Sequence, residues 1–185
     1  MYHQFEHNLP SSYQGFKREI HQIFPHIFDT KHVCFSLRKK IKKQNLKLER
    51  LLVSSNLNEL EKVLSERPDQ PHVPRLIHPD GFTRYQGQEL PHQAGYDALL
   101  AGTCFLNLAY LAASLEHPQQ RPLSFRETLA AVEEHENMVN IARAAVSYVH
   151  LAGRDPELTR PAWLHLSSKT GSVLNCTSMA EILAR

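Results

Sequence analysis

Cysteine is scarce in this sequence, and its cysteines lie far apart. The chain has 185 residues and three cysteines, Cys34, Cys104 and Cys176, with no Cys-x-x-Cys spacing. A disulfide-stapled secreted protein and a cysteine-ligated zinc site both need paired or closely spaced cysteines. The pattern argues against both and favours a reducing compartment. We therefore expect an intracellular protein in the cytoplasm, the nucleus or both.

A charge bias and a leader segment are also missing. The 21 Lys and Arg nearly balance the 19 Asp and Glu, and a net charge of +2 does not by itself indicate a polyanionic partner. Residues 1–8 are polar and rich in histidine, so no signal peptide is expected. The composition, 42% apolar and 22% charged, is typical of a soluble globular chain of one domain, or one domain and part of another.

Charged side chains are absent from one long stretch, residues 98–115. Eighteen uncharged residues reach the length at which a membrane helix becomes a candidate. However, Gly102, Thr103, Asn107 and Ser114 dilute the stretch, and no basic residue flanks it. We therefore expect a helix buried inside the protein and no membrane span in this chain.

Capping residues and prolines predict where other elements begin and end. Ser11 or Ser12 begins a helix that ends before Pro25, and Asn56 begins one that stops before Pro68. The basic run from Arg38 to Arg50 is either a solvated helix face or a contact for RNA phosphate or nuclear import. The other expected elements are a brief strand at 26–30, a helix at 92–115, a helix through 129–142 in one or two pieces, strands at 147–151 and 163–166, and a helix at 179–184 capped by Ser178.

A histidine and an aspartate five residues apart carry the chemical signature of the chain. Asp97 directly precedes the uncharged stretch, so we expect a half-buried carboxylate that needs a backbone N–H, a cation or a metal as partner. From spacing alone two interpretations stay open. One is a helix-capping carboxylate beside a surface residue, His92, and the other is a catalytic pair.

Four segments match, in order, the motifs of one nuclease family. Residues 91–98, Pro-His-Gln-Ala-Gly-Tyr-Asp-Ala, resemble a third exonuclease motif in its His-x4-Asp form. Residues 24–31 fit Phe-Pro-x-x-x-Asp-Thr-Lys, and residues 56–61 resemble Ser-Leu-x-Glu-Leu-Glu. The fourth segment has two pieces, residues 149–155 and 164–166, which together resemble the start of an RNA-recognition-motif (RRM) fold. Together these segments resemble the poly(A)-specific ribonuclease (PARN) type of the CAF1 family of DEDD exoribonucleases.

The resemblance implies an α/β fold in two parts. Residues 1–144 would be the C-terminal portion of a ribonuclease-H-like exonuclease domain, mostly helical here, and residues 145–185 a truncated RRM-like strand–helix unit. In that unit Tyr148, Trp163 and His165 would either stack on bases or pack in a core. The implied activity is 3′→5′ trimming of poly(A) tails or other RNA 3′ ends, with RNA as partner and a homodimer as assembly. The subgroup that trims piwi-interacting RNA (piRNA) precursors, whose members carry a C-terminal membrane anchor, also fits.

The resemblance also implies roles for individual residues. His92 would be the general base, Asp97 one of four carboxylates that hold two Mg²⁺ ions, and Asp29 and Lys31 structural residues near the site. It assigns no RNA-binding residue. The family's Asp-x-Glu and Gly-His-Asn-x3-Asp motifs have no counterpart ahead of Asp97. We therefore expect a C-terminal fragment that is inactive alone. The alternative is a non-catalytic isoform that acts at most as an RNA-binding or assembly module.

Overall fold

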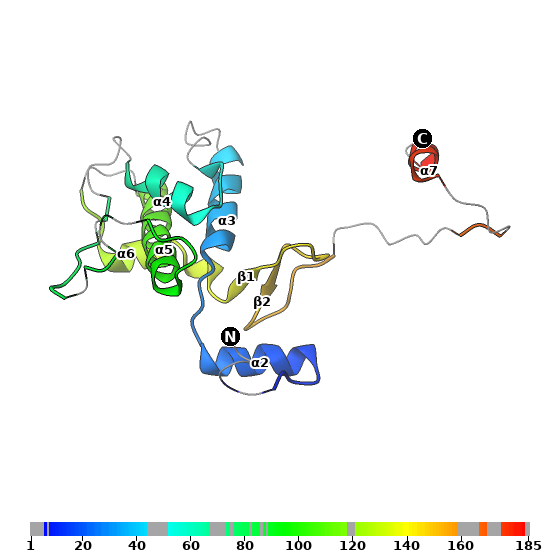
Figure 1. Ribbon diagram of the computed structural model, residues 1–185, viewed down its shortest axis with the longest axis horizontal. Helices are drawn as coiled ribbons and strands as arrows, with labels where there is room; N and C mark the ends of the chain where they lie inside the picture. Colours follow the sequence, from blue (N-terminus) through cyan, green and yellow to red (C-terminus); the bar gives the residue numbers. More distant parts are fainter. Residues whose placement is uncertain are drawn as a thin grey trace.

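Helices dominate the structure, a computed structural model that describes residues 6, 8–43, 52–66, 73–74, 76–81, 83–85, 87, 89–117, 121–158, 167–169 and 175–183. One small two-stranded sheet accompanies them (Figure 1). The elements are α2 (Tyr13–Ile23), α3 (Thr30–Lys43), α4 (Leu57–Ser65), α5 (Ala94–Glu116), α6 (Phe125–Ala130), the 3₁₀ turn η2 (Glu133–His135), β1 (Met138–Asn140), β2 (Tyr148–His150) and α7 (Cys176–Leu183). The described chain is therefore α/β with helix in large excess, as expected.

Two of the helices begin at the capping residues that the sequence predicts. The Ser12 hydroxyl accepts a hydrogen bond from Gly15 N at 3.1 Å, and α2 ends just before Phe24 and Pro25. The Asn56 side chain accepts from the backbone N–H groups of Asn58 and Glu59 at the start of α4. These bonds satisfy N–H groups that a helix cannot satisfy internally.

Helices α3 and α4 each pack against α5, and all three run in the same direction (Figure 1). Four side-chain contacts define that direction, because early residues of α3 and α4 meet earlier residues of α5 and late residues of α3 and α4 meet later residues of α5. They are Thr30–Ala101 and Lys40–Glu116 between α3 and α5, and Asn58–Tyr96 and Ser65–Asn107 between α4 and α5. The N-termini of all three helices therefore lie at one end, where their dipoles place partial positive charge.

Helix α5 is the centre of the core. Its buried residues pack on α3, α4 and α6, and Leu108, Ala109, Leu111 and Ala112 have no exposed surface. By length and composition alone α5 could cross a membrane, but half of its most apolar stretch is buried inside this fold. The uncharged run predicted to be a buried helix is thus the core helix of the described chain.

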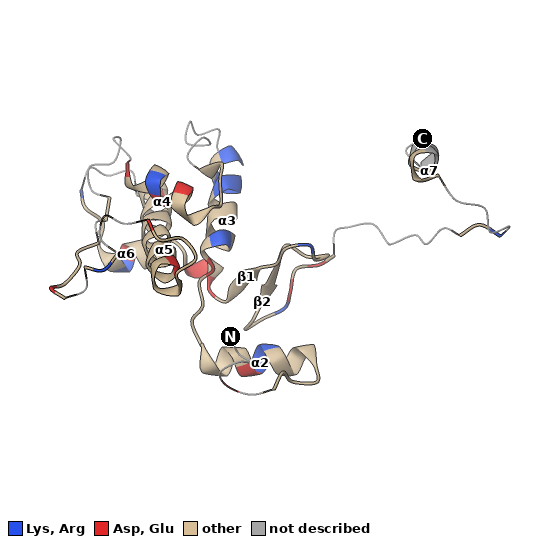
Figure 2. Ribbon diagram, viewed as in Figure 1, with Lys and Arg blue, Asp and Glu red and all other residues tan. Residues whose placement is uncertain are grey.

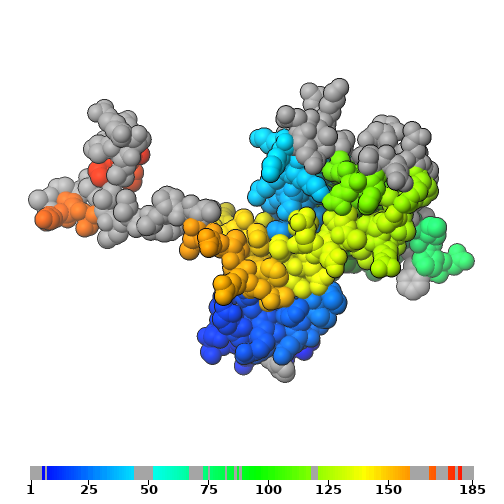
Figure 3. Space-filling view, turned by 180° about the vertical axis from the view of Figure 1, so that it is seen from behind, coloured from blue at the N-terminus to red at the C-terminus, as the bar shows by residue number. Residues whose placement is uncertain are grey.

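A hairpin of β1 and β2 packs beside α2. The strands are antiparallel, with Val139 opposite Val149. Figure 3 shows α2 (blue) lying against the hairpin and the residues after it (yellow to orange). Lys17 of α2 joins the two: its ammonium donates to the Gly153 carbonyl at 2.7 Å and pairs with Asp155 at 2.9 Å.

Asn137 joins the segment after α2 to the start of the hairpin. Its side chain donates to the Pro25 carbonyl at 2.9 Å and accepts from Ile27 N at 3.2 Å, and its own N–H donates to the Ile27 carbonyl. It is buried with φ of 60°, a left-handed backbone that asparagine tolerates better than most residues. These bonds correct the strand predicted at 26–30, since residues 27–29 are irregular and Ile27 bonds to a single residue.

Two further element predictions are wrong. Val139 lies in β1 and not in a helix, because the helical pattern through 129–142 ends with α6 and the turn η2. The last helix begins at Cys176, with Asn175 as the residue whose side chain accepts from Thr177 N, so Ser178 lies inside α7.

The domain boundary at residues 144–145 stays a prediction. The β1–β2 hairpin spans that boundary. The RRM-like unit is not seen among the described residues, and the strand predicted at 163–166 lies outside them.

Candidate functional site

His92 lies in the turn that leads into α5, with its side chain exposed. Its φ of 69° is in the left-handed region that side chains other than glycine rarely adopt, and such residues cluster at functional sites. The His92 N–H donates to Oδ1 of Asp97 at 3.3 Å. Asp97, half-buried in the first turn of α5, thus fixes the backbone of the histidine that precedes it. The structure therefore brings the two predicted site residues together.

Gly95 lets a tyrosine lie directly against the start of α5. A Cβ atom at this position would come within 2.4 Å of the Tyr85 hydroxyl oxygen. The rings of Tyr85 and Tyr96 are 6.0 Å apart, and the Tyr96 hydroxyl donates to Asn58 Oδ1 on α4 at 3.3 Å. Tyr85 was not predicted from the sequence. The signal for it is Gly95, since close approach of another group is one of the few reasons for a glycine in the first turn of a helix.

The Tyr96 hydroxyl remains a donor over a wide pH range. Burial raises the pKa of Tyr96, and the negative charges of Glu89, Glu61 and Asp97 raise it further. The bond to Asn58 therefore holds the first turn of α5 against α4 at neutral pH.

A hollow of about 380 Å³ lies where α3, α4 and α5 begin. We call it the N-terminal hollow; it is lined by Phe28, Asp29, Thr30, Lys31, Cys34, Ser55, Leu57, Leu60 and Ala101. Ala101 is four residues, about one turn, after Asp97. Exposed Lys31 and the helix N-termini favour an anion at this end of the molecule.

Asp29 is bound by main-chain groups on both of its oxygens. Oδ1 accepts from Lys31 N at 2.8 Å and from His32 N at 3.4 Å, which caps α3. Oδ2 accepts from Asn140 N of β1 at 2.7 Å. Lys31 itself reaches over the ring of Phe35 at 5.9 Å. Asp29 thus joins α3 to the hairpin, and its importance to a reaction centre stays a prediction.

The described residues do not by themselves form a two-metal centre. Among them, no group of three or more His, Cys, Asp or Glu side chains is placed to hold a metal ion. His92 and Asp97 supply one imidazole and one carboxylate, whereas Mg²⁺ requires near-octahedral oxygen ligands. These two side chains therefore do not complete a two-ion site among the described residues.

The model of the CAF1 family ribonucleases matches residues 1–105, which include His92 and Asp97. The chain belongs to the CAF1 ribonuclease family. Nucleases of this family are generally dependent on divalent metal ions, and the family implies a ribonuclease-H-like fold.

Curated relatives of this CAF1-family chain are named as exonucleases and ribonucleases. The pre-piRNA 3′-exonuclease trimmer of Bombyx mori is 31% identical over 99% of this chain and 34% of its own length. The poly(A)-specific ribonuclease PNLDC1 of Homo sapiens is 32% identical over 91% of this chain and 32% of its own length. The poly(A)-specific ribonuclease PARN of Homo sapiens is 30% identical over 89% of this chain and 24% of its own length. The chain thus spans about a third or less of the length of these relatives.

Proposed function

We propose that this chain carries the third-motif part of a 3′→5′ exoribonuclease that trims RNA 3′ ends. The observation that carries the proposal is the contact between the His92 N–H and Asp97 at the start of α5, within the region that matches the family. The names of the relatives support an RNA substrate and action at a 3′ end.

In this proposal His92 is the general base. Its side chain is exposed, and an imidazole can accept a proton from an attacking water near neutral pH. The left-handed backbone and the bond to Asp97 fix where the imidazole is presented. The helix N-termini around the N-terminal hollow favour the negative charge of a phosphodiester there.

Asp97 is the proposed metal-binding carboxylate. Its Oδ1 accepts from His92 N, and its Oδ2 forms no hydrogen bond to any described residue. Bound divalent ions would supply charge stabilisation for the attacking and leaving oxygens. Because a two-ion site needs carboxylates besides Asp97, the activity belongs to a polypeptide that joins this segment to them.

A second candidate is a non-catalytic module that binds RNA or assembles with other chains. The observation that favours it is that the described residues contain no metal-binding cluster. The transcript ahead of Met1 separates the two candidates: in-frame Asp-x-Glu and Gly-His-Asn-x3-Asp motifs support the nuclease, and their absence supports the module. Dimerisation stays a prediction, testable by sedimentation.

The decisive assay follows a 5′-labelled RNA with Mg²⁺ and compares this chain with the polypeptide extended upstream. We expect the extended polypeptide to shorten the RNA from its 3′ end, and this chain alone to leave it intact. In the extended polypeptide, His92→Ala should lower the rate by roughly 10²–10⁴, the usual contribution of a general base. Asp97→Ala should abolish the metal-dependent rate.

Asp80→Ala is the matched control, since Asp80 is an exposed carboxylate in the loop before α5. Full activity of His92→Ala would rule out the assigned base. Parallel substrates with an oligo(A) tail and with a mixed-sequence 3′ extension decide between poly(A) and small-RNA precursors.

A further inference from the structure

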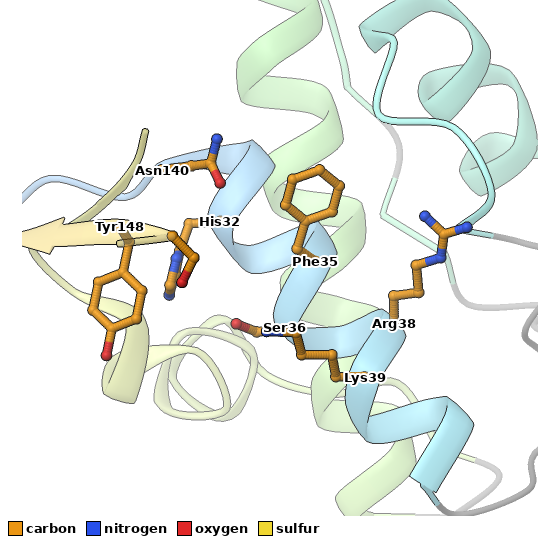
Figure 4. Close-up of a pocket in the computed structure, with 8 residues that line it drawn as sticks. His32, Phe35, Ser36, Arg38, Lys39, Asn140 and Tyr148 are labelled. Atoms are coloured by element: carbon orange, nitrogen blue, oxygen red, sulfur yellow. The ribbon is translucent and has the colours of Figure 1, made fainter. Parts of the chain in front are cut away.

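A hollow separate from the N-terminal hollow lies between α3 and the hairpin (Figure 4). Its volume is about 280 Å³. The lining residues that matter here are His32, Phe35, Ser36 and Lys39 of α3, and Asn140 and Tyr148 of the two strands. Neighbouring residues of α3 face the two hollows, Lys31 and Cys34 the N-terminal one and His32 and Phe35 this one. One helix therefore separates them.

This hollow continues into a second one. The neighbour, about 420 Å³, is lined by the loop 141–147 and shares Phe35, Asn140 and Ser147 with the first. Together they form what we call the α3–hairpin groove. Its combined size falls in the range of ligand pockets, roughly 300–1,000 Å³.

The groove has fixed aromatic walls. The His32 ring meets the Tyr148 ring edge-on at 4.7 Å and the His135 ring edge-on at 5.4 Å. Burial, and then the neighbouring His135, lowers the pKa of His32, so the imidazole that supports Tyr148 is neutral at physiological pH. Phe35, half-exposed on α3, provides a second aromatic surface.

Positive charge lies beside these rings. Figure 4 shows the Lys39 side chain turned toward the His32 side of the hollow, whereas Arg38 points away from it. Exposed Arg143 lines the second hollow. Neither Lys39 nor Arg143 forms a salt bridge with a described residue, and none of the described residues that line the first hollow is acidic. The described lining of the second hollow includes one acidic residue, Glu157.

The groove thus combines aromatic surfaces, cations without a salt-bridge partner among the described residues, and the side-chain amide of Asn140. This combination is typical of a site that binds single-stranded nucleic acid. Unstacked bases lie on aromatic rings, phosphates bind Lys and Arg, and side-chain amides bond to base edges. A duplex cannot use such a groove, because its bases are stacked inside. An acidic peptide would use the cations but leave the rings without a partner.

We propose that the α3–hairpin groove binds a nucleotide of single-stranded RNA a few positions before the 3′ end, with its base against Phe35 and Tyr148 and its phosphates at Lys39 and Arg143. The inference rests on the proposed function, which supplies RNA as substrate. The two hollows lie on either side of α3, and a helix with its side chains is about 10 Å across. A strand whose 3′ end lies at the N-terminal hollow reaches the groove within a few nucleotides.

The test is RNA binding by the 185-residue chain, measured by fluorescence anisotropy with a labelled twelve-nucleotide oligo(A) over a series of salt concentrations. Lys39→Ala/Arg143→Ala should weaken binding roughly tenfold at low salt. It should also reduce the slope of log K against log[salt] by about 1.4, since each single-strand phosphate contact contributes about 0.7. Lys42→Ala/Lys43→Ala removes two exposed charges from the same helix outside the groove and should leave binding near that of the unmodified chain.

Equal loss in both double variants would overturn the proposal, because it would show that the basic helix binds RNA without using the groove. Absence of RNA binding by the unmodified chain would also overturn it and would point to a protein occupant. Photo-crosslinking of a 4-thiouridine RNA should modify Phe35 or Tyr148. This test measures RNA binding and needs neither His92 nor hydrolysis. Failure of the groove proposal is therefore seen as a loss of groove-dependent binding, and failure of the proposed function is seen in the activity assay.

Discussion

Gly95 and Gly102 are seven residues apart on α5, but their surroundings differ. An added methyl at Gly102 meets no atom within 4 Å, whereas at Gly95 it meets the Tyr85 ring and hydroxyl. Alanine is favoured over glycine in a helix by about 1 kcal/mol. Gly102→Ala should therefore raise the free energy of unfolding by about that amount. Gly95→Ala should give no gain, because Tyr85 has to move away.

Urea unfolding followed by circular dichroism measures both changes. In the Tyr85→Ala background the obstacle at Gly95 is gone, so Gly95→Ala should become stabilising there. An equal gain at the two glycines in the unmodified chain would contradict the described packing of Tyr85.

Single residues were predictable from sequence where the physics is local. Ser12 and Asn56 cap helices with their own side chains, and the spacing of His92 and Asp97 places both at one helix start. The role of Asn137 was not predictable, because three of its hydrogen bonds reach Pro25 and Ile27, more than a hundred positions away. A local sequence pattern does not indicate hydrogen-bond partners that are distant in the sequence.

At the scale of elements, α2 is attached to the hairpin through one ionic cluster. Burial opposes ionisation of Asp155, but the hydrogen bonds from His150 N, the Tyr13 hydroxyl and the Lys17 ammonium outweigh it and lower the pKa of Asp155. Burial and the Asp155 carboxylate raise the pKa of Tyr13 to about 12. The cluster is thus built from a carboxylate that resists protonation and a phenol that resists ionisation.

The contribution of this cluster to stability should depend on pH in two opposite ways. A lowered carboxyl pKa stabilises the fold above the unfolded value of about 3.9, and that part is lost as pH falls below it. A raised phenol pKa stabilises the fold below about pH 10, and that part is lost as pH rises from about 10 to 12. Urea midpoints between pH 7 and 3 should fall less in Asp155→Asn than in the unmodified chain. Tyr13→Phe should remove the alkaline loss.

Lys17→Met tests how much the Lys17 ammonium contributes to stability, because methionine is a long side chain without a charge. Lys17 has 5% side-chain exposure and Asp155 25%. We expect a loss of about 2 kcal/mol, less than the roughly 3–5 kcal/mol for breaking a fully buried pair. Faster hydrogen exchange confined to α2 amides would confirm that the cluster attaches this helix, whereas unchanged α2 exchange would show that it does not.

Helices were predicted better than strands. Caps and apolar spacing revealed α2, α4 and α5, whereas β1 has three residues, too few for a period of two to differ from a helical one. The start of α3 was missed because Asp29 falls within the strand predicted at 26–30, although its side chain caps the helix that follows.

Apart from α7, the elements that the structure describes form a helical bundle, α3 to α6, and a smaller unit of α2 with the hairpin (Figure 2 shows the basic residues of α3 on the bundle). Asp29 connects them, since one oxygen caps α3 and the other binds β1. Asp29→Ala should cost about 2–3 kcal/mol, the sum of a lost cap and a lost bond to a charged acceptor. Asp29→Asn, which keeps one acceptor oxygen, should cost about half.

Amide hydrogen exchange measures directly whether Asp29 links α3 to β1. The Asn140 N–H should lose protection in Asp29→Asn while the α3 start keeps it, and Asp80→Ala should change neither. Equal exchange at the Asn140 N–H in the unmodified chain, Asp29→Asn and Asp80→Ala would show that Asp29 does not hold the hairpin to the bundle.

The left-handed backbone at His92 has a consequence for selection experiments. Glycine occupies φ of 69° without the cost of roughly 1–2 kcal/mol that a side chain meets there. A library randomised at this position and sorted for folded protein should therefore enrich glycine over histidine. If the same library, placed in the extended polypeptide of the proposed function and sorted for RNA trimming, enriches histidine instead, the difference between the two profiles measures what the imidazole contributes beyond the fold.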